Sequence, residues 1–175
     1  MRTFRTALAN CLLAETEFTH RRSNLLAQHG LDGDDVIAND TLPTAVADSL
    51  GPRDLELVHR IRQFESCPLG ITLSGPAYRD NPLLYVNETF SEITGYQLMS
   101  VRGKNPRFLQ GPETERAPLD RLHEAIDIWE RVTVELRNYR RDGSQFDNRL
   151  TVVPVPDETG TINNWIGIQA AVDDV

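Results

Sequence analysis

Three amide side chains occupy positions where the alternation of a β-strand would place apolar residues. Asn138 lies in the alternating run that begins at Val132, Asn148 lies in the next run, and Gln169 lies in the last one. A strand that turns one face toward a core normally buries apolar side chains on that face. A buried amide without partners costs about 1–3 kcal/mol. The three amides therefore predict either a polar ligand between them or hydrogen bonds to one another and to the backbone.

A second polar constellation is the run Gly103-Lys104-Asn105-Pro106-Arg107-Phe108-Leu109-Gln110. Asn is among the best residues for capping the start of a helix. Pro suits the first helical position, because its missing N–H would have no partner there. Asn105 and Pro106 thus predict the start of a short helix, although an Asn-Pro pair also fits an ordinary turn. The guanidinium of Arg107 suits bidentate contact with a phosphate.

This run, continued by Gly111-Pro112-Glu113-Thr114, resembles the signature of light-oxygen-voltage (LOV) domains, the flavin-binding branch of the PAS family. The family usually has cysteine at the position of Pro106, and that cysteine bonds to the light-excited flavin. Pro106 offers no nucleophile. The resemblance therefore implies a flavin pocket that does not form a cysteinyl-flavin adduct, and we expect Cys67 and Cys11 to lie away from the ring.

The resemblance also implies roles for individual residues. The amides occur here as Asn138-Tyr139, Phe146-Asp147-Asn148 and Gly167-Ile168-Gln169, as LOV domains place them around the flavin ring. Asn105 and Gln110 match contacts to the ribityl chain, and Thr72 matches a residue that lines the ring pocket. Asn87 matches a family position at the start of the helix predicted at 88–95, where it could equally cap the helix or have a functional role. The predicted cofactor-binding set is Thr72, Asn105, Pro106, Arg107, Leu109, Gln110, Arg121, His123, Asn138, Asn148, Leu150 and Gln169, with no catalytic residue and no metal ligand.

Two departures from the family pattern bear on the cofactor and on the outer surface. The family commonly has a second phosphate-binding arginine where this chain has His123. Histidine is mostly neutral at pH 7, so phosphate binding should weaken, and Arg121 is an imperfect substitute on another side of the helix. FMN is the expected cofactor, with FAD or riboflavin as alternatives. Asp147 stands where tryptophan is common, at a position that should face away from the flavin.

The order of the strands and helices that must position these residues is that of an α+β PAS fold. Such a fold has a five-stranded antiparallel sheet with short helices on one face. We expect this domain over residues 66–175 and a helical extension over residues 1–65. Strands are predicted at 71–74, 83–87, 132–138, 146–152 and 165–169, with a hairpin turn at Arg141-Asp142-Gly143. Helices are predicted at 88–95 and at 118–129, the latter with Pro118 first and with Leu119, Leu122, Ile126 and Trp129 on one face.

The extension shows two helical patterns. Phe4, Leu8 and Leu12 follow a helical spacing that Gly30 should stop. Leu55, Val58 and Ile61 mark a second helix, with Pro52 near its start. The stripe of this second helix suits a homodimer through the N-terminal helices as well as it suits packing within the chain.

Composition narrows the possible partners. The net charge is −8 and no basic cluster is present, which argues against direct nucleic-acid binding. No stretch suits a signal peptide or a membrane span, and the two distant cysteines fit a reducing cytoplasm. Asp32-Gly33-Asp34-Asp35 has the look of a calcium loop, but the alternation of an EF-hand does not continue, so a solvated turn is expected.

These observations predict a flavin-binding blue-light or redox sensor. It would signal through flavin photoreduction to the neutral semiquinone, followed by rotation of the Gln169 amide. Trp165 is the first choice of electron donor, because it shares a strand face with Gln169; the other candidates are Trp129, Tyr85, Tyr96 and Tyr139. The alternative is a cofactor-free PAS module for protein interaction or dimerisation. An enzyme is not expected, because no general acid, base or nucleophile accompanies the motifs.

The chain stops at Val175, soon after the last predicted strand. Output is therefore expected to pass through the N-terminal helices to an unknown effector, unless the chain is a fragment of a longer protein.

Overall fold

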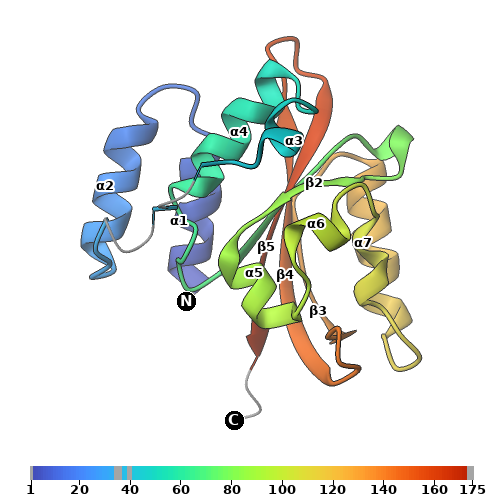
Figure 1. Cartoon of the computed structure of the whole chain (residues 1–175). Coiled ribbons are helices and arrows are strands. Elements are labelled where there is room, and N and C mark those ends of the chain that lie inside the picture. Colours follow the sequence, from blue (N-terminus) through green and yellow to red (C-terminus); the bar gives the residue numbers. More distant parts are fainter. Residues whose placement is uncertain (1, 34–36, 39–40, 173–175) are drawn as a thin grey trace. The chain divides into compact units, whose positions relative to one another are not determined.

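A computed structural model describes residues 2–33, 37–38 and 41–172 (Figure 1). The chain divides into two compact units, Met1–Cys67 and Pro68–Val175. Of the Asp32–Asp35 stretch, Asp34 and Asp35 lie outside the described residues.

The N-terminal unit contains four helices among its described residues: α1 (Arg2–Leu12), α2 (Phe18–Gln28), α3 (Thr44–Ala47) and α4 (Pro52–Arg62). We predicted that the first helix continues to Gly30, but α1 ends at Leu12 and a second helix, α2, precedes Gly30. Glu17 adopts a left-handed conformation (φ 64°) at the residue before α2 begins. Gly30, also with positive φ, follows the end of α2 and acts as the predicted stop.

A buried arginine ties α1 to α4. The guanidinium of Arg60 donates to the carbonyl oxygens of Leu12 (3.2 Å) and Ala14 (2.6 Å) and forms an ion pair with Glu56. The last carbonyls of a helix have no intrahelical partner, and a cation there is favourable. Arg60 therefore closes the C-terminal end of α1 while its own charge is paired.

The stripe on α4 is less available for a dimer than we expected. Pro52 starts the helix as predicted, but Val58 and Ile61 are fully buried and only Leu55 is partly exposed. A side chain that is buried within one chain cannot also cover a second copy. A homodimer would need another surface or a rearrangement of this helix.

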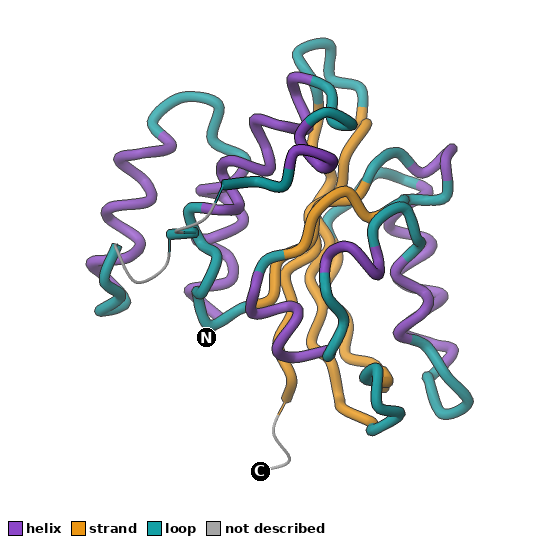
Figure 2. The backbone as a smooth tube through the Cα atoms, in the orientation of Figure 1, coloured by secondary structure: helices purple, strands orange, loops and turns teal. Residues whose placement is uncertain are grey.

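The C-terminal unit is built on the predicted sheet. Its strands are β1 (Gly70–Ser74), β2 (Leu83–Val86), β3 (Val132–Tyr139), β4 (Gln145–Pro156) and β5 (Ile162–Val172). They form one antiparallel sheet in the order β2-β1-β5-β4-β3 (Figure 2). The expectation of a five-stranded PAS fold preceded by helices is confirmed.

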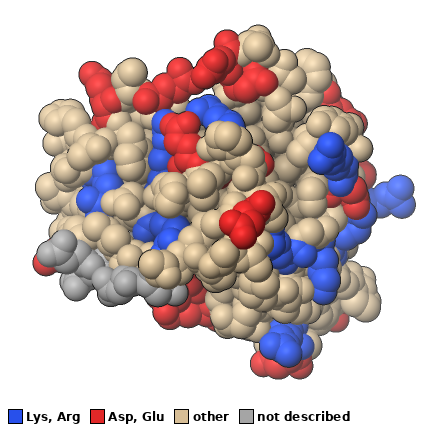
Figure 3. Space-filling model, turned by 45° about the horizontal axis from the view of Figure 1, so that its top comes forward, with Lys and Arg blue, Asp and Glu red and all other residues tan. Residues whose placement is uncertain are grey.

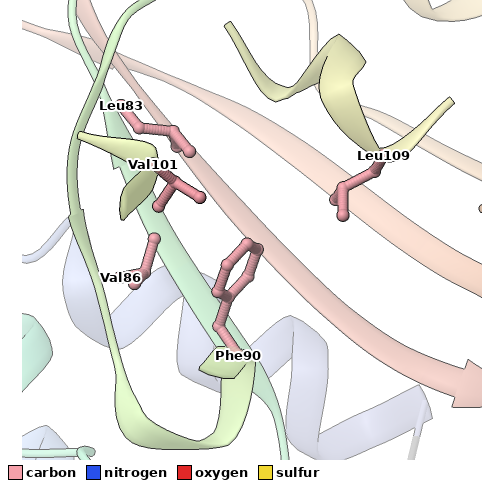
Figure 4. Packing of buried hydrophobic residues seen from close by; sticks show 5 residues of the cluster. All are labelled: Leu83, Val86, Phe90, Val101 and Leu109. Atoms are coloured by element: carbon pink, nitrogen blue, oxygen red, sulfur yellow. The ribbon is translucent and has the colours of Figure 1, made fainter. Parts of the chain in front are cut away.

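Short helices cover one face of this sheet (Figure 1). They are η1 (Ala77–Arg79), α5 (Glu88–Thr94), α6 (Leu98–Val101), η2 (Pro106–Leu109) and α7 (Arg116–Asp127). A cluster of buried apolar side chains packs α5, α6 and η2 together with β2 (Figure 4): Leu83, Val86, Phe90, Val101 and Leu109.

Helix α7 is shifted relative to the prediction for residues 118–129. It begins at Arg116, so Pro118 lies within the first turn rather than at its first position. Proline is tolerated there because the first N–H groups of a helix have no intrahelical partner. The helix ends at Asp127, and Trp129 then takes a positive φ of 57°. Trp129 is consequently 65% exposed and does not share the face of Ile126.

The hairpin between β3 and β4 turns where the sequence predicted it. Gly143 adopts a positive φ of 85°, and one carboxylate oxygen of Asp142 accepts from the backbone N–H (2.9 Å) and the hydroxyl (2.6 Å) of Ser144. These hydrogen bonds lower the pKa of Asp142. The turn fixes the register that brings Leu136 opposite Asn148.

Asn87 joins β1 to α5 from a fully buried position. Its side-chain oxygen accepts from the N–H groups of Ile71 (2.7 Å) and Phe90 (3.1 Å), and its amide nitrogen donates to the carbonyl of Leu69 (3.0 Å). The capping interpretation of Asn87 is confirmed, and the same side chain also anchors the start of β1.

We predict that Asn87→Ala lowers the free energy of unfolding by about 2–4 kcal/mol, because it leaves several buried backbone groups without partners. Thermal unfolding followed by circular dichroism measures this. Asn24→Ala is the matched control: its amide is exposed and bonds to His20, so its loss should cost no more than about 0.5 kcal/mol. Equal unfolding curves for the two variants would contradict the structural role of Asn87.

Candidate functional site

A cavity of about 560 Å³ lies within the C-terminal unit, between the inner face of the sheet and the helices. This volume is in the range of pockets that enclose small organic ligands. Strands β1, β3, β4 and β5 supply one wall, and α5, η2 and α7 supply the other. The lining residues include Thr72, Phe90, Asn105, Leu109, Gln110, His123, Leu136, Asn138, Asn148, Trp165, Gly167 and Gln169.

The structure brings the predicted site residues together, with one exception. Every residue of the predicted cofactor-binding set lines the cavity except Arg121. Arg121 is exposed, and its guanidinium donates to the backbone carbonyl of Thr133 on the edge strand β3 (3.4 Å). Residues that are two positions apart in an α-helix differ by about 200° around its axis, so Arg121 and His123 point in different directions. Arg121 therefore lies off the described cavity lining, and its part in binding a phosphate stays a prediction.

The amides from three strands meet at one point of the inner sheet face. The amide nitrogen of Asn148 donates to the side-chain oxygen of Asn138 (2.8 Å) and, at 3.4 Å, to that of Gln169. Asn138 in turn donates to the carbonyl of Arg137 (3.1 Å). The amides thus pair partly with one another, which was the alternative to a ligand.

The pairing is incomplete. Within the described part of the chain, the side-chain oxygen of Asn148 and the side-chain nitrogen of Gln169 are buried without a hydrogen-bond partner. One is an acceptor and the other is a donor, and both side chains line the cavity. A ligand edge that both donates and accepts would satisfy the two atoms.

A glycine provides space on the floor of the cavity. A Cβ atom at Gly167 would lie 2.4 Å from the hydroxyl of Thr72 and 3.6 Å from Leu150, so any side chain there would displace Thr72 into the cavity. Trp165 lies on the same face of β5, is buried, and has an indole N–H without a partner among the described residues. Of the aromatic residues considered as electron donors, Trp165 alone is found on the described cavity lining.

The segment that follows Gln110 is fastened to β3. A Cβ atom at Gly111 would lie only 2.3 Å from the ring of Tyr139, so glycine permits the two to stack closely. The hydroxyl of Tyr139 accepts from the N–H of Glu113 (3.0 Å), and the hydroxyl of Thr114 donates to the carbonyl of Arg137 (2.6 Å). These contacts also cover exposed backbone groups of an edge strand.

Asn105 and Pro106 start η2 as predicted. The side-chain oxygen of Asn105 accepts from the N–H of Arg107 (2.9 Å), and Pro106 is the first residue of the helix. The short helix places Leu109 and Gln110 on the cavity wall.

Sequence reasoning missed the partner of Arg107. The guanidinium of Arg107 makes two contacts with the carboxylate of Asp80, at 2.5 and 2.8 Å, and Asn105 donates to the backbone oxygen of Asp80 (2.7 Å). The residues lie far apart in the sequence, so spacing did not indicate the pair. The sequence Asp80-Asn81-Pro82 does mark a turn, which was the available signal.

Titratable groups also line the cavity. Asp80, His123 and Asp127 all contribute to the lining. Asp80 is engaged by Arg107, and all three side chains are exposed. Asp147, in contrast, is not on the described lining and pairs with Arg137 (3.0 Å), which raises the pKa of that arginine.

Neither cysteine is on the described cavity lining, and both are buried thiols. Burial raises the pKa of Cys11 to about 11, so its thiol stays protonated at neutral pH. A protonated thiol is a poor nucleophile.

Comparison with known proteins identifies the family. The model of the PAS domain matches residues 68–170. The chain belongs to the PAS family. This PAS domain is 41% identical over 111 residues to the bacterioopsin transcriptional activator of Halobacterium salinarum, an alignment that covers 63% of the chain and 16% of the relative. It is 35% identical over 108 residues to a blue-light-activated histidine kinase of Brucella anthropi, covering 62% and 22% of the two proteins.

Solved structures give the same result. The LOV domain of the blue-light-activated histidine kinase EL346 from Erythrobacter litoralis superposes with a TM-score of 0.58 at 38% identity, covering 61% of this chain and 98% of that one. The chain spans only 16% and 22% of the two curated relatives named above. What the whole relatives do is therefore not carried over with the PAS domain.

We predict that Gln169→Leu stabilises the ligand-free protein by about 1 kcal/mol, because it removes a buried donor that lacks a partner. Asn138→Leu should do the opposite, since it leaves Asn148 without its 2.8 Å acceptor. Thermal unfolding of the two flavin-free variants measures both effects. Loss of stability in Gln169→Leu would show that the amide is satisfied without a ligand.

Proposed function

We propose that this chain is a flavin-binding blue-light or redox sensor that works without a cysteinyl-flavin adduct. The observation that carries the proposal is the pair of unsatisfied atoms in the cavity, the Asn148 oxygen and the Gln169 nitrogen. The pyrimidine edge of a flavin ring offers donors and acceptors side by side, so it matches this pair. The names of the relatives, a blue-light-activated histidine kinase among them, support the same function.

FMN is the first choice of cofactor, with FAD and riboflavin as alternatives. Asn138, Asn148 and Gln169 would hold the ring edge, and Thr72 and Leu150 would line the ring. Asn105 and Gln110 would face the ribityl chain. Arg107 is the only lysine or arginine on the described lining, so it alone is placed to meet a phosphate.

A bound flavin supplies one-electron photochemistry: blue light makes the ring a strong oxidant, and the reduced ring takes up a proton at N5. Trp165 would donate the electron, because its indole is buried on the cavity lining. Pro106 leaves no thiol where an adduct would form.

Gln169 would convert the chemistry into a structural signal. Gln169 would lie beside N5 of a bound flavin, and its amide would present the nitrogen to N5 as an acceptor or the oxygen to N5 as a donor. Rotation between these two orientations would break the 3.4 Å contact with Asn148. Strand β5 pairs with both β1 and β4, and Ile168 and Ala170 beside Gln169 point to the other sheet face. A shift of β5 would therefore reach both halves of the sheet.

A cofactor-free interaction module is the second candidate. The hydrogen bond between Asn148 and Asn138 favours it, because it shows that the amides can satisfy one another in part.

With either function, the downstream effector and a homodimer through the N-terminal helices stay predictions. Charges of both signs are mixed on the face drawn in Figure 3, which agrees with a role other than nucleic-acid binding.

A cytoplasmic location is proposed because the two cysteines are thiols and not a disulfide, which fits a reducing compartment. Within the described residues, no helix has the length and apolar character needed to cross a bilayer.

The absorption spectrum of the purified protein, in the dark and under blue light with a mild reductant, tests the proposal. We expect a structured flavin band that changes under light to the broad absorption of a singly reduced, protonated flavin. The double variant Cys11→Ala/Cys67→Ala should behave the same way, since neither thiol is on the described lining. Trp165→Phe should slow the change.

Two results would contradict this. Bleaching to a thiol-adduct spectrum that the double variant lacks would show that a cysteine reaches the ring. A colourless protein that takes up no added flavin would favour the interaction module.

The relay through Gln169 has its own test. In Gln169→Leu we expect the light-driven absorption change to remain and the structural change in β5 to disappear, because leucine cannot rotate an acceptor toward N5. Hydrogen exchange of β5 amides in the dark and in the light measures the structural change. Thr161→Ala, in the exposed turn before β5, is a control that should retain it. An intact light-driven structural change of β5 in Gln169→Leu would contradict the relay.

A further inference from the structure

The end of the cavity that would receive a flavin phosphate carries its own anion. Asp80 and Arg107 form a two-contact ion pair, at 2.5 and 2.8 Å, and both residues line the cavity. The two oxygens of the carboxylate meet the two terminal nitrogens of the guanidinium. This is the bidentate geometry that a phosphate would otherwise use.

The position of Asp80 is set by its turn and not by Arg107 alone. Asp80 and Asn81 have positive φ angles of 68° and 44°, a region that Asp and Asn tolerate better than most other residues. The N–H of Asp80 donates to Ala77 (2.9 Å), and that of Asn81 donates to Pro76 (3.1 Å). Asn105 donates to the backbone oxygen of Asp80 (2.7 Å) and to its carboxylate (3.2 Å). The loop thus holds the carboxylate beside Arg107.

The remaining charges around the cavity do not restore a phosphate site. Asp127 adds a second carboxylate to the lining, and His123 adds an imidazole in place of a second guanidinium. Against these, Arg107 is the one guanidinium on the described lining. A phosphate dianion would therefore meet more negative than positive charge, on a chain whose net charge is already −8.

We infer that Asp80 competes with the flavin phosphate for Arg107, so that the cavity binds riboflavin about as well as FMN. This inference rests on the proposed flavin function and defines which flavins the site accepts. The ring and the ribityl contacts supply the affinity, and the phosphate adds little.

Titration of the flavin-free full chain with riboflavin and with FMN, followed by quenching of flavin fluorescence, tests the inference. We expect dissociation constants within about fivefold of each other, since an exposed ion pair contributes little in water. Added salt should strengthen FMN binding by screening repulsion and leave riboflavin binding unchanged. An attractive phosphate site would show the opposite salt dependence for FMN.

Asp80→Asn keeps a residue that tolerates positive φ and removes the charge. We expect it to tighten FMN binding by about five- to tenfold and to leave riboflavin unchanged, a gain that corresponds to one freed charge-assisted contact. Arg107→Gln should abolish this gain in the double variant while changing little by itself. Asp120→Asn, on α7 but outside the described lining, makes the same charge change elsewhere and should have no effect.

The outcomes separate this inference from the proposed function. FMN binding about a hundredfold tighter than riboflavin, unaltered in Asp80→Asn, would overturn the competition by Asp80 and leave the flavin site intact. A chain that binds neither flavin would overturn both proposals.

Discussion

The structure depends on the hydrogen bonding of three amides buried on the inner face of the sheet. A buried amide that lacks partners costs about 1–3 kcal/mol, which is a large part of the stability of a small domain. Asn138, Asn148 and Gln169 come from three adjacent strands, so they meet only if β3, β4 and β5 are in register. Their mutual contacts satisfy part of the network, and the two remaining atoms face a cavity. The amide network thus leaves one buried acceptor and one buried donor without a partner among the described residues.

The rest of the C-terminal unit keeps that cavity open and defined. Gly167 withholds a side chain from the floor, and the stacking of Tyr139 on Gly111 fixes the segment beyond Gln110. Asn87 and Asn105 start α5 and η2 with side-chain caps, which sets where each short helix begins over the sheet. Each of these contacts is local. The caps stabilise the helices that they start, whereas Gly167 leaves out a side chain that could pack in the cavity, which gives up stability for space.

Much of this arrangement could be predicted from the sequence. Strand alternation gave the inward positions of the amides, and the Asn105-Pro106 pair gave the start of η2, because both patterns are local. The bounds predicted for the helix of residues 118–129 lay two residues beyond those of α7, because a proline is tolerated anywhere in the first turn of a helix. The start of α2 after Glu17 and the exposure of Trp129 both involve positive φ angles in residues other than glycine, which sequence patterns predict poorly. The Asp80–Arg107 pair was missed because it joins distant segments.

The same interactions explain why loss of the cysteine need not mean loss of the cofactor. The family resemblance assigns the reaction with the flavin to the thiol, whereas in this chain the amides, Thr72 and the helix η2 line the cavity. Replacement by proline keeps the start of η2, because proline fits the first helical position. The pocket residues therefore remain under the same physical constraints. The role proposed for Gln169 needs only a ligand atom whose hydrogen bonding changes with the redox state and a strand that transmits the change. Strand β5, paired on both sides, provides that path across the sheet.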